Sequence, residues 1–333
     1  MRAGPSTVAA ALLAAMLALV LTAGCTTSRE PSRDDGRSAS QKPSPSGSTS
    51  PTAVAGSVLA VKIDNAPGAR PQTGLDSADI VYVEQVEGGL SRMMAVYATK
   101  VPKAVGPVRS ARESDLELLG QFTRPVLAFS GAQGKLLPLI DRAPLDAVTP
   151  EDGAGAGAYY RGTKRAAPHN LYVRPGRLMP SAPGSAALTT GFRYGTAPSG
   201  GTAQPSLTVR YPAARFTFTW SVSRARWLVS TDGAPTVTTD GTQVAPATVV
   251  VQYVKVRASG FHDFLGNNTP YTETVGSGRA RVLRDGRVHD VNWKRATATD
   301  GTDFTTADGA PVAFAEGQVW VVFAQAPDAA QAP

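Results

Sequence analysis

The chain has 333 residues, enough for two domains of ordinary size, and it carries a formal net charge of +7. It contains one cysteine, so no disulfide can form within the chain and a dithiol redox site is excluded. No Walker-type phosphate loop occurs and the three histidines lie far apart in the sequence, so we predict no metal and no cofactor.

The first segment is typical of a secretion signal. Arg2 is its only charge, and residues 7–23 are apolar or small, a run that is short for a membrane span. Small residues then lead into Cys25, as in bacterial lipoprotein signals. We predict a signal peptide over residues 1–24 and a lipid anchor, such as palmitate, on Cys25, which would hold the protein on the extracytoplasmic face of the cell membrane. A plain signal peptide with an incidental cysteine is the alternative.

A tether and two domains are predicted to follow. Residues 25–54 are rich in Ser, Thr, Pro and charges, which predicts a disordered tether. Residues 55–195 combine apolar strands with amphipathic stretches, and we expect a mixed α/β N-terminal domain. Short β-rich runs separated by Asp-Gly turns then predict a smaller, mainly antiparallel β domain over residues 205–325. The fold class is therefore α+β.

Two local elements of the N-terminal domain matter for the site. Strands on either side of Gly88 and Gly89 predict a hairpin, with Ile80 and Glu84 on one face of its first strand. A helix is expected over residues 111–121, because its leucines form an apolar stripe. Ser110 followed three residues later by Glu113 predicts a capping box at its start.

The run GPVRSAR, residues 106–112, is the first candidate site. It places Arg109, Ser110 and Arg112 at the start of the expected helix, where unpaired amides attract anions. Arginine binds phosphate or carboxylate bidentately, so one interpretation is an anion site. The other is an internal ion pair with a nearby acid: Glu84, Glu87, Glu113 or Asp115.

Two carboxylates and one histidine are the candidate catalytic groups. Glu84 and Glu87 could serve as acid and base in glycoside hydrolysis, although pairing with arginines such as Arg92 is the simpler interpretation. His169 stands beside Asn170 among several cations, which favour the neutral imidazole, able to act as a base. The same pair could bind a ligand without catalysis, or His169 could be a buried structural residue.

Charge is distributed unevenly. From Gly153 to Thr231 there are ten Lys or Arg and no Asp or Glu. Such a stretch creates a positive local field, unless acids from elsewhere neutralise it on folding. Outside the cytoplasm we expect an anionic wall polymer or a phosphorylated precursor as partner, and no nucleic acid.

Three runs carry a family resemblance. VKIDNAPGARPQTGLDSADIVYVEQVEGGLSRMMAVY, GPVRSAR and RAAPHNLY, together with the C-terminal NWKR, resemble the YerB-like lipoproteins, a bacterial family of unknown function. The resemblance covers roughly residues 57–323, although residues 289–292 depart from it before the tryptophan. It implies an envelope-anchored two-domain protein without an established activity. It also suggests that GPVRSAR and PHNLY contribute to one recurrent constellation: Arg109, Ser110, Arg112, His169 and Asn170.

Three functions follow as hypotheses. The first is a binding module for an anionic envelope ligand, held by Arg92 and that constellation. The second is an enzyme acting on wall glycan or a phosphorylated precursor, with Glu84 or Glu87 and His169 as acid and base. The third is a scaffold whose C-terminal strands recruit another envelope protein.

Overall fold

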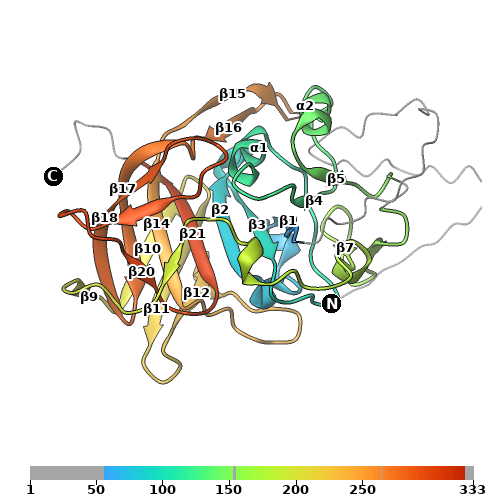
Figure 1. Cartoon of the computed structure of the whole chain (residues 1–333). Coiled ribbons are helices and arrows are strands. Elements are labelled where there is room, and N and C mark those ends of the chain that lie inside the picture. Colours follow the sequence, from blue (N-terminus) through green and yellow to red (C-terminus); the bar gives the residue numbers. More distant parts are fainter. Residues whose placement is uncertain (1–55, 153–154, 264, 327–333) are drawn as a thin grey trace, which may run out of the picture. The chain divides into compact units, whose positions relative to one another are not determined.

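The computed structural model describes residues 56–152, 155–263 and 265–326 (Figure 1). The predicted signal peptide, the lipidation site at Cys25 and the tether lie outside these residues. Two short α-helices, α1 Glu113–Leu119 and α2 Leu137–Arg142, occur in the described part of the chain. Short 3-10 helices are η1 Pro67–Ala69, η2 Leu75–Ser77, η3 Glu87–Gly89, η4 Pro175–Arg177 and η5 Ser185–Ala187.

Strands form most of the regular structure. In the first half they are β1 Leu59–Asp64, β2 Ile80–Gln85, β3 Ser91–Tyr97, β4 Val126–Ala128, β5 Asp146–Val148, β6 Tyr159–Arg161, β7 Leu171–Val173, β8 Arg193–Tyr194 and β9 Thr202–Ala203. The remainder are β10 Ser206–Tyr211, β11 Ala214–Ser221, β12 Arg226–Thr231, β13 Ala234–Pro235, β14 Thr248–Val254, β15 Val256–His262, β16 Asn268–Thr272, β17 Gly276–Arg284, β18 Arg287–Arg295, β19 Asp303–Thr305, β20 Ala313–Phe314 and β21 Val319–Gln325. The predicted α+β class therefore holds only in part, since helices are few.

One eleven-stranded sheet runs through both halves of the chain. Its order is β19-β18-β17-β14-β21-β2-β3-β1-β4-β5, with β9 added beside β18. The last strand, β21, lies between β14 and β2 and is parallel to both (Figure 1). Ile80 pairs with Val319 and Val83 with Val322, so the hydrogen-bonded ladder passes without a break from the N-terminal to the C-terminal part. The predicted domain limits, 55–195 and 205–325, stay a prediction.

Side-chain alternation gives this sheet two buried faces. On one face Val81 and Val83 share a core with Trp320 and with the antiparallel four-stranded sheet β10-β11-β12-β13. On the other face Ile80 and Tyr82 share a core with the apolar side of α1. The predicted hairpin and the predicted faces of its first strand are confirmed, with η3 forming the turn between β2 and β3.

The start of α1 differs from its prediction. The N-cap is Arg112, and the carboxylate of Asp115 accepts a hydrogen bond from the Arg112 backbone N–H at 2.7 Å. Asp115 thus makes the reciprocal bond that had been assigned to Glu113, so the predicted box is wrong by two residues. The shift follows from the start of the helix, because Asp115 stands three residues after the N-cap Arg112, as Glu113 does after Ser110.

Two sets of contacts between residues far apart in the sequence attach α1 to the C-terminal part of the chain. The Glu117 carboxylate accepts bonds from the Tyr271 hydroxyl, from the backbone N–H and hydroxyl of Thr274, and from the Val275 backbone N–H. Burial would raise the pKa of Glu117, but these donors hold it below its ordinary value. The buried Arg295 guanidinium donates to the carbonyl of Glu117 at 2.9 Å. The helix is therefore held from both its side chain and its backbone.

Candidate functional site

A row of charged residues crosses three strands on the face of the sheet that α1 covers. The register places Arg92 of β3 opposite both Glu84 of β2 and Asp64 of β1. Lys62 lies on the same face of β1, two residues before Asp64. All four residues are buried. Charges taken out of water are costly unless they are paired, so the contacts of these groups determine what the site can do.

The innermost group is Lys62, which lies between two carboxylates. Its ammonium donates to Asp115 at 2.6 Å and to Glu84, and the Ser114 hydroxyl donates to Glu84 at 2.8 Å. Burial would lower the pKa of Lys62, but the two carboxylates raise it above its ordinary value. Burial and the neighbouring Asp115 raise the pKa of Glu84 despite its pairing with Lys62. Glu84, a predicted acid or base, is thus part of a closed ionic group.

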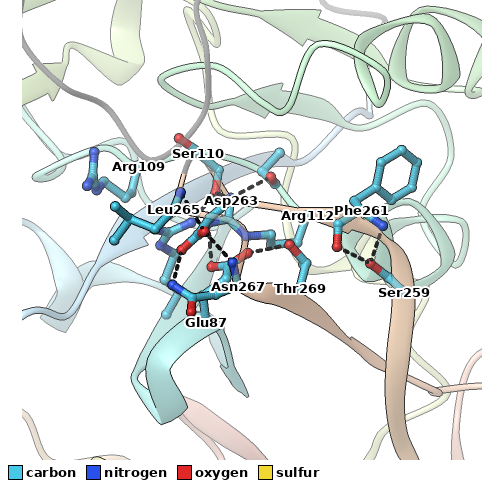
Figure 2. Close-up of polar contacts among 12 residues, drawn as sticks. Glu87, Arg109, Ser110, Arg112, Ser259, Phe261, Asp263, Leu265, Asn267 and Thr269 are labelled. Carbon is cyan, nitrogen blue, oxygen red and sulfur yellow. Dashed lines mark hydrogen bonds and ion pairs between the residues drawn. The ribbon is translucent and has the colours of Figure 1, made fainter.

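A second group joins α1 to the β15–β16 hairpin. The Arg112 guanidinium donates to Glu87 at 2.7 Å, and the other carboxylate oxygen of Glu87 accepts from Thr269 at 2.5 Å. Figure 2 shows these three residues beside the turn of the hairpin, with Arg109 off to one side. The open question of whether Arg112 pairs internally is answered, and Glu87 is one of the acids expected as its partner.

Arg92 and Ser110 belong to the buried layer between these groups. A guanidinium nitrogen of Arg92 donates to the Ser110 carbonyl at 3.2 Å. Ser110 is fully buried, and its hydroxyl lies 3.4 Å from that of Ser130. Both side chains lie beneath the surface in this structure. Their contact with a ligand stays a prediction.

The outermost group consists of Asp64, Arg109 and His169. A carboxylate oxygen of Asp64 lies 2.7 Å from His169 Nδ1 and 3.3 Å from Arg109 Nε. Its other oxygen accepts the backbone N–H of Ala66 at 3.0 Å. Burial would raise the pKa of Asp64, but the bond from His169 and the charge of Arg109 lower it below its ordinary value. Asp64 is therefore an ionised acceptor at neutral pH.

His169 is the member of this group that reaches solvent. Its side chain is 28% exposed, against 4% for Asp64. The ring lies against Gly68, where a Cβ atom would come within 3.0 Å of the imidazole. A glycine at this position thus leaves room for the ring.

The loop between β6 and β7 is ordered by side-chain contacts to backbone. Arg165 donates to the carbonyls of Ala69 and Pro71, which belong to the same segment that supports His169. Asn170 accepts from Arg161 at 2.8 Å and donates to the carbonyls of Gly162 and Arg165. The amide of Asn170 therefore holds the loop, and the loop holds His169 beside Asp64.

Cations collect on this loop and the segment after it. We define the β6–β7 basic surface as five residues: Arg161, Lys164, Arg165, Arg174 and Arg177. In residues 56–152, 155–263 and 265–326, none of them lies within ion-pair distance of an Asp or Glu. The Tyr160 and Tyr172 rings stack at 5.5 Å, and the Arg174 guanidinium lies 4.2 Å above Tyr160. This surface joins positive charge to aromatic faces.

The predicted site residues thus separate into two depths. Arg109 and His169 meet on Asp64, with Asn170 next along the chain, whereas Arg112 pairs with Glu87. Sequence reasoning missed Lys62 and Asp64, although charged residues at alternate positions of an apolar strand were a usable signal. Among the described residues, no hydrogen bond or ion pair links Glu84 or Glu87 to His169.

The described residues contain no helix of sufficient length and apolar character to cross a bilayer. They also contain no group of three His, Cys, Asp or Glu that could hold a metal ion.

Comparison with known proteins gives consistent matches over both halves. Residues 46–187 match the family described as "Protein of unknown function (DUF3048) N-terminal domain", and residues 207–321 match the corresponding C-terminal domain. The chain is 26% identical over 273 residues to the "Putative lipoprotein YerB" of Bacillus subtilis (strain 168), covering 79% of this chain and 80% of that protein. The crystal structure of Bacillus subtilis YerB matches with a TM-score of 0.66 and 22% identity, covering 80% of this chain and 90% of the solved one. This chain is similar to YerB in sequence and in fold. The chain therefore belongs to the DUF3048 family of two-domain proteins.

Proposed function

We propose that the protein is a lipoprotein, anchored through Cys25 to the extracytoplasmic face of the cell membrane, that binds an anionic cell-envelope ligand on the β6–β7 basic surface. The anchor is supported by the LTAGC run and by similarity to a protein described as a lipoprotein. The ligand class is supported by one observation above all, the cluster of cations around His169 that has no carboxylate partner among the described residues.

Burial determines which of the basic residues would meet the ligand. Arg161, Lys164, Arg174 and Arg177 are exposed, whereas Arg109 and Arg112 are buried against carboxylates. In this proposal Arg109 does not contact the ligand. It helps to keep Asp64 ionised, and Asp64 holds His169 in position. The ligand itself contacts the exposed cations, and arginine favours phosphate or carboxylate groups with two oxygens to offer.

The test is a thermal-shift titration of the full chain in detergent with pyrophosphate, at constant ionic strength. A ligand at about 100 times its Kd stabilises a protein by about 2.7 kcal/mol, so Tm should rise by several degrees. The double variant Lys164→Glu/Arg177→Glu should lose this shift and keep its own Tm, because neither side chain makes an ion pair with described residues.

Arg224→Glu is the matched control. Arg224 is also exposed and lies in the same acid-free stretch, but on the turn between β11 and β12. It should keep the full shift. An equal loss in both variants would indicate diffuse attraction and no local site, and no shift in the unmodified chain would remove the proposal.

Hydrolysis is the second candidate, favoured by the contact between Asp64 and His169, an arrangement that general bases use. It predicts turnover of wall fragments or phosphorylated precursors that is lost in His169→Ala. Glu84→Gln should affect turnover only through folding, since Glu84 is closed in by Lys62 and Ser114. Equal turnover in the unmodified protein and His169→Ala would exclude this role.

A further inference from the structure

We propose that His169 accepts a hydrogen bond from a hydroxyl group of the ligand, so that the preferred ligand is a phosphate ester of a polyol or sugar. This inference rests on the proposed anion binding and adds a second contact to it. The β6–β7 basic surface would hold the phosphate, and Nε2 of His169 would accept a hydrogen bond from a neighbouring hydroxyl.

The tautomer of His169 follows from its partner. Asp64 is buried, and the bond from His169, the charge of Arg109 and the Ala66 N–H lower its pKa below the ordinary value. The ionised carboxylate can only accept hydrogen bonds. Nδ1, 2.7 Å away, must therefore carry a proton and donate it. In the neutral ring the lone pair then belongs to Nε2. Asp64 thus selects the tautomer of the neutral ring in which Nε2 is the nitrogen that can accept a hydrogen bond.

The position of Nε2 allows a ligand to reach it. His169 is partly exposed, and Nε2 makes no hydrogen bond to the described residues. Gly68 supports the ring from one side without a side chain that would cover it. Nε2 of this histidine is therefore open to solvent, whereas Nδ1 is held by Asp64.

Donors predominate among the charged side chains of the loop that carries His169, which makes an acceptor there informative. Arg161 and Arg165 belong to the same loop, and their guanidinium groups can only donate. A deprotonated phosphate ester without a hydroxyl group satisfies donors and leaves Nε2 without a partner. A hydroxyl next to the phosphate supplies the missing proton. The stacked rings of Tyr160 and Tyr172 offer an apolar face for the carbon chain or ring that connects the two groups.

The experiment compares glycerol phosphate with propyl phosphate, which has the same chain length and no hydroxyl group. Calorimetric titration of the full chain in detergent should give about tenfold tighter binding of glycerol phosphate, the equivalent of one good hydrogen bond. His169→Phe should bind both ligands with the affinity of propyl phosphate. His262→Phe, which changes an exposed histidine on β15, should keep the tenfold preference.

The outcomes separate this inference from the function on which it rests. Equal affinities for the two esters in the unmodified chain, or a preference that survives in His169→Phe, would overturn the hydroxyl contact and leave anion binding intact. Binding of neither ester would overturn both.

A second measurement tests the tautomer directly. Nitrogen NMR of the labelled protein should show an Nδ1–H, unprotonated Nε2 ring for His169, and Asp64→Asn should disturb this signature. Gly68→Ala adds a methyl group 3.0 Å from the ring and should reduce the preference between esters while propyl phosphate still binds. A ring with its proton on Nε2 would overturn the inference.

Discussion

Two sets of cations in this protein look alike in the sequence and differ in the structure. Arg109 and Arg112, in GPVRSAR, are buried and paired with Asp64 and Glu87. Lys164 and Arg177, in the β6–β7 basic surface, are exposed and lie near no described carboxylate. The difference comes from the supply of acids: Asp64 of β1 and Glu87 of the η3 turn lie against the first set, and no described acid pairs with the second. Local arginine density therefore does not tell which cations are buried in ion pairs, whereas the supply of nearby acids does.

The largest effect should come from removing the buried Lys62. Lys62→Met leaves Glu84 and Asp115 facing each other without a cation and should lower the free energy of unfolding by about 3–5 kcal/mol. Lys164→Met removes an exposed lysine and should change it by less than about 0.5 kcal/mol. Urea denaturation monitored by circular dichroism measures both values, and similar losses in the two variants would contradict the division into two sets.

A smaller effect, with a pH signature, is expected at Glu117. The pKa of Glu117 in the folded protein lies below the ordinary value of 4.5. Its contribution to the free energy of unfolding is therefore present above pH 4.5 and is lost as the pH falls through the folded pKa. Glu117→Gln should therefore cost about 1–3 kcal/mol at pH 7, the range for hydrogen bonds to a charged group, and much less at pH 3. Denaturation curves at the two pH values test this, and a cost that does not change with pH would show that the charge is irrelevant.

The smallest effect on stability should come from the exposed set. Lys164→Ala/Arg177→Ala should leave the free energy of unfolding within about 0.5 kcal/mol of the unmodified chain, since neither side chain makes an ion pair with described residues. The same variant should weaken pyrophosphate binding and flatten its dependence on salt. Denaturation and titration on one preparation check both, and a large loss of stability would move these residues into the structural set.

The local fold was predictable where one strand or turn carries its own pattern. The alternation from Ile80 to Glu84 and the glycines after it were enough to predict the β2–β3 hairpin and its faces. Ser110 and Glu113 were predicted to form the capping box of α1, but the spacing fits more than one start, and the helix begins two residues later, with Arg112 as N-cap and Asp115 at the third position. The balance between helix and strand was predicted less well, since strands form most of the regular structure in the described residues.

The candidate site was predictable only in part for a related reason. Arg109, His169 and Asn170 were identified from local runs, and they do lie in one region. Their connection through Asp64 was missed, because that residue lies 105 positions from His169 in the sequence. Only the register of β1 with β3 and the fold of the β6–β7 loop bring these residues together.

The position of β21 has a consequence for how the chain is made. Until residues 319–325 leave the ribosome, β2 and β14 each lack the neighbour that lies between them in the finished sheet. A growing chain that has passed β14 but not reached β21 thus exposes two unpaired strand edges, and unsatisfied edges invite pairing with other chains. We expect a nascent chain that ends before residue 319 to depend on holding factors, and its release from them to coincide with arrival of the final strand.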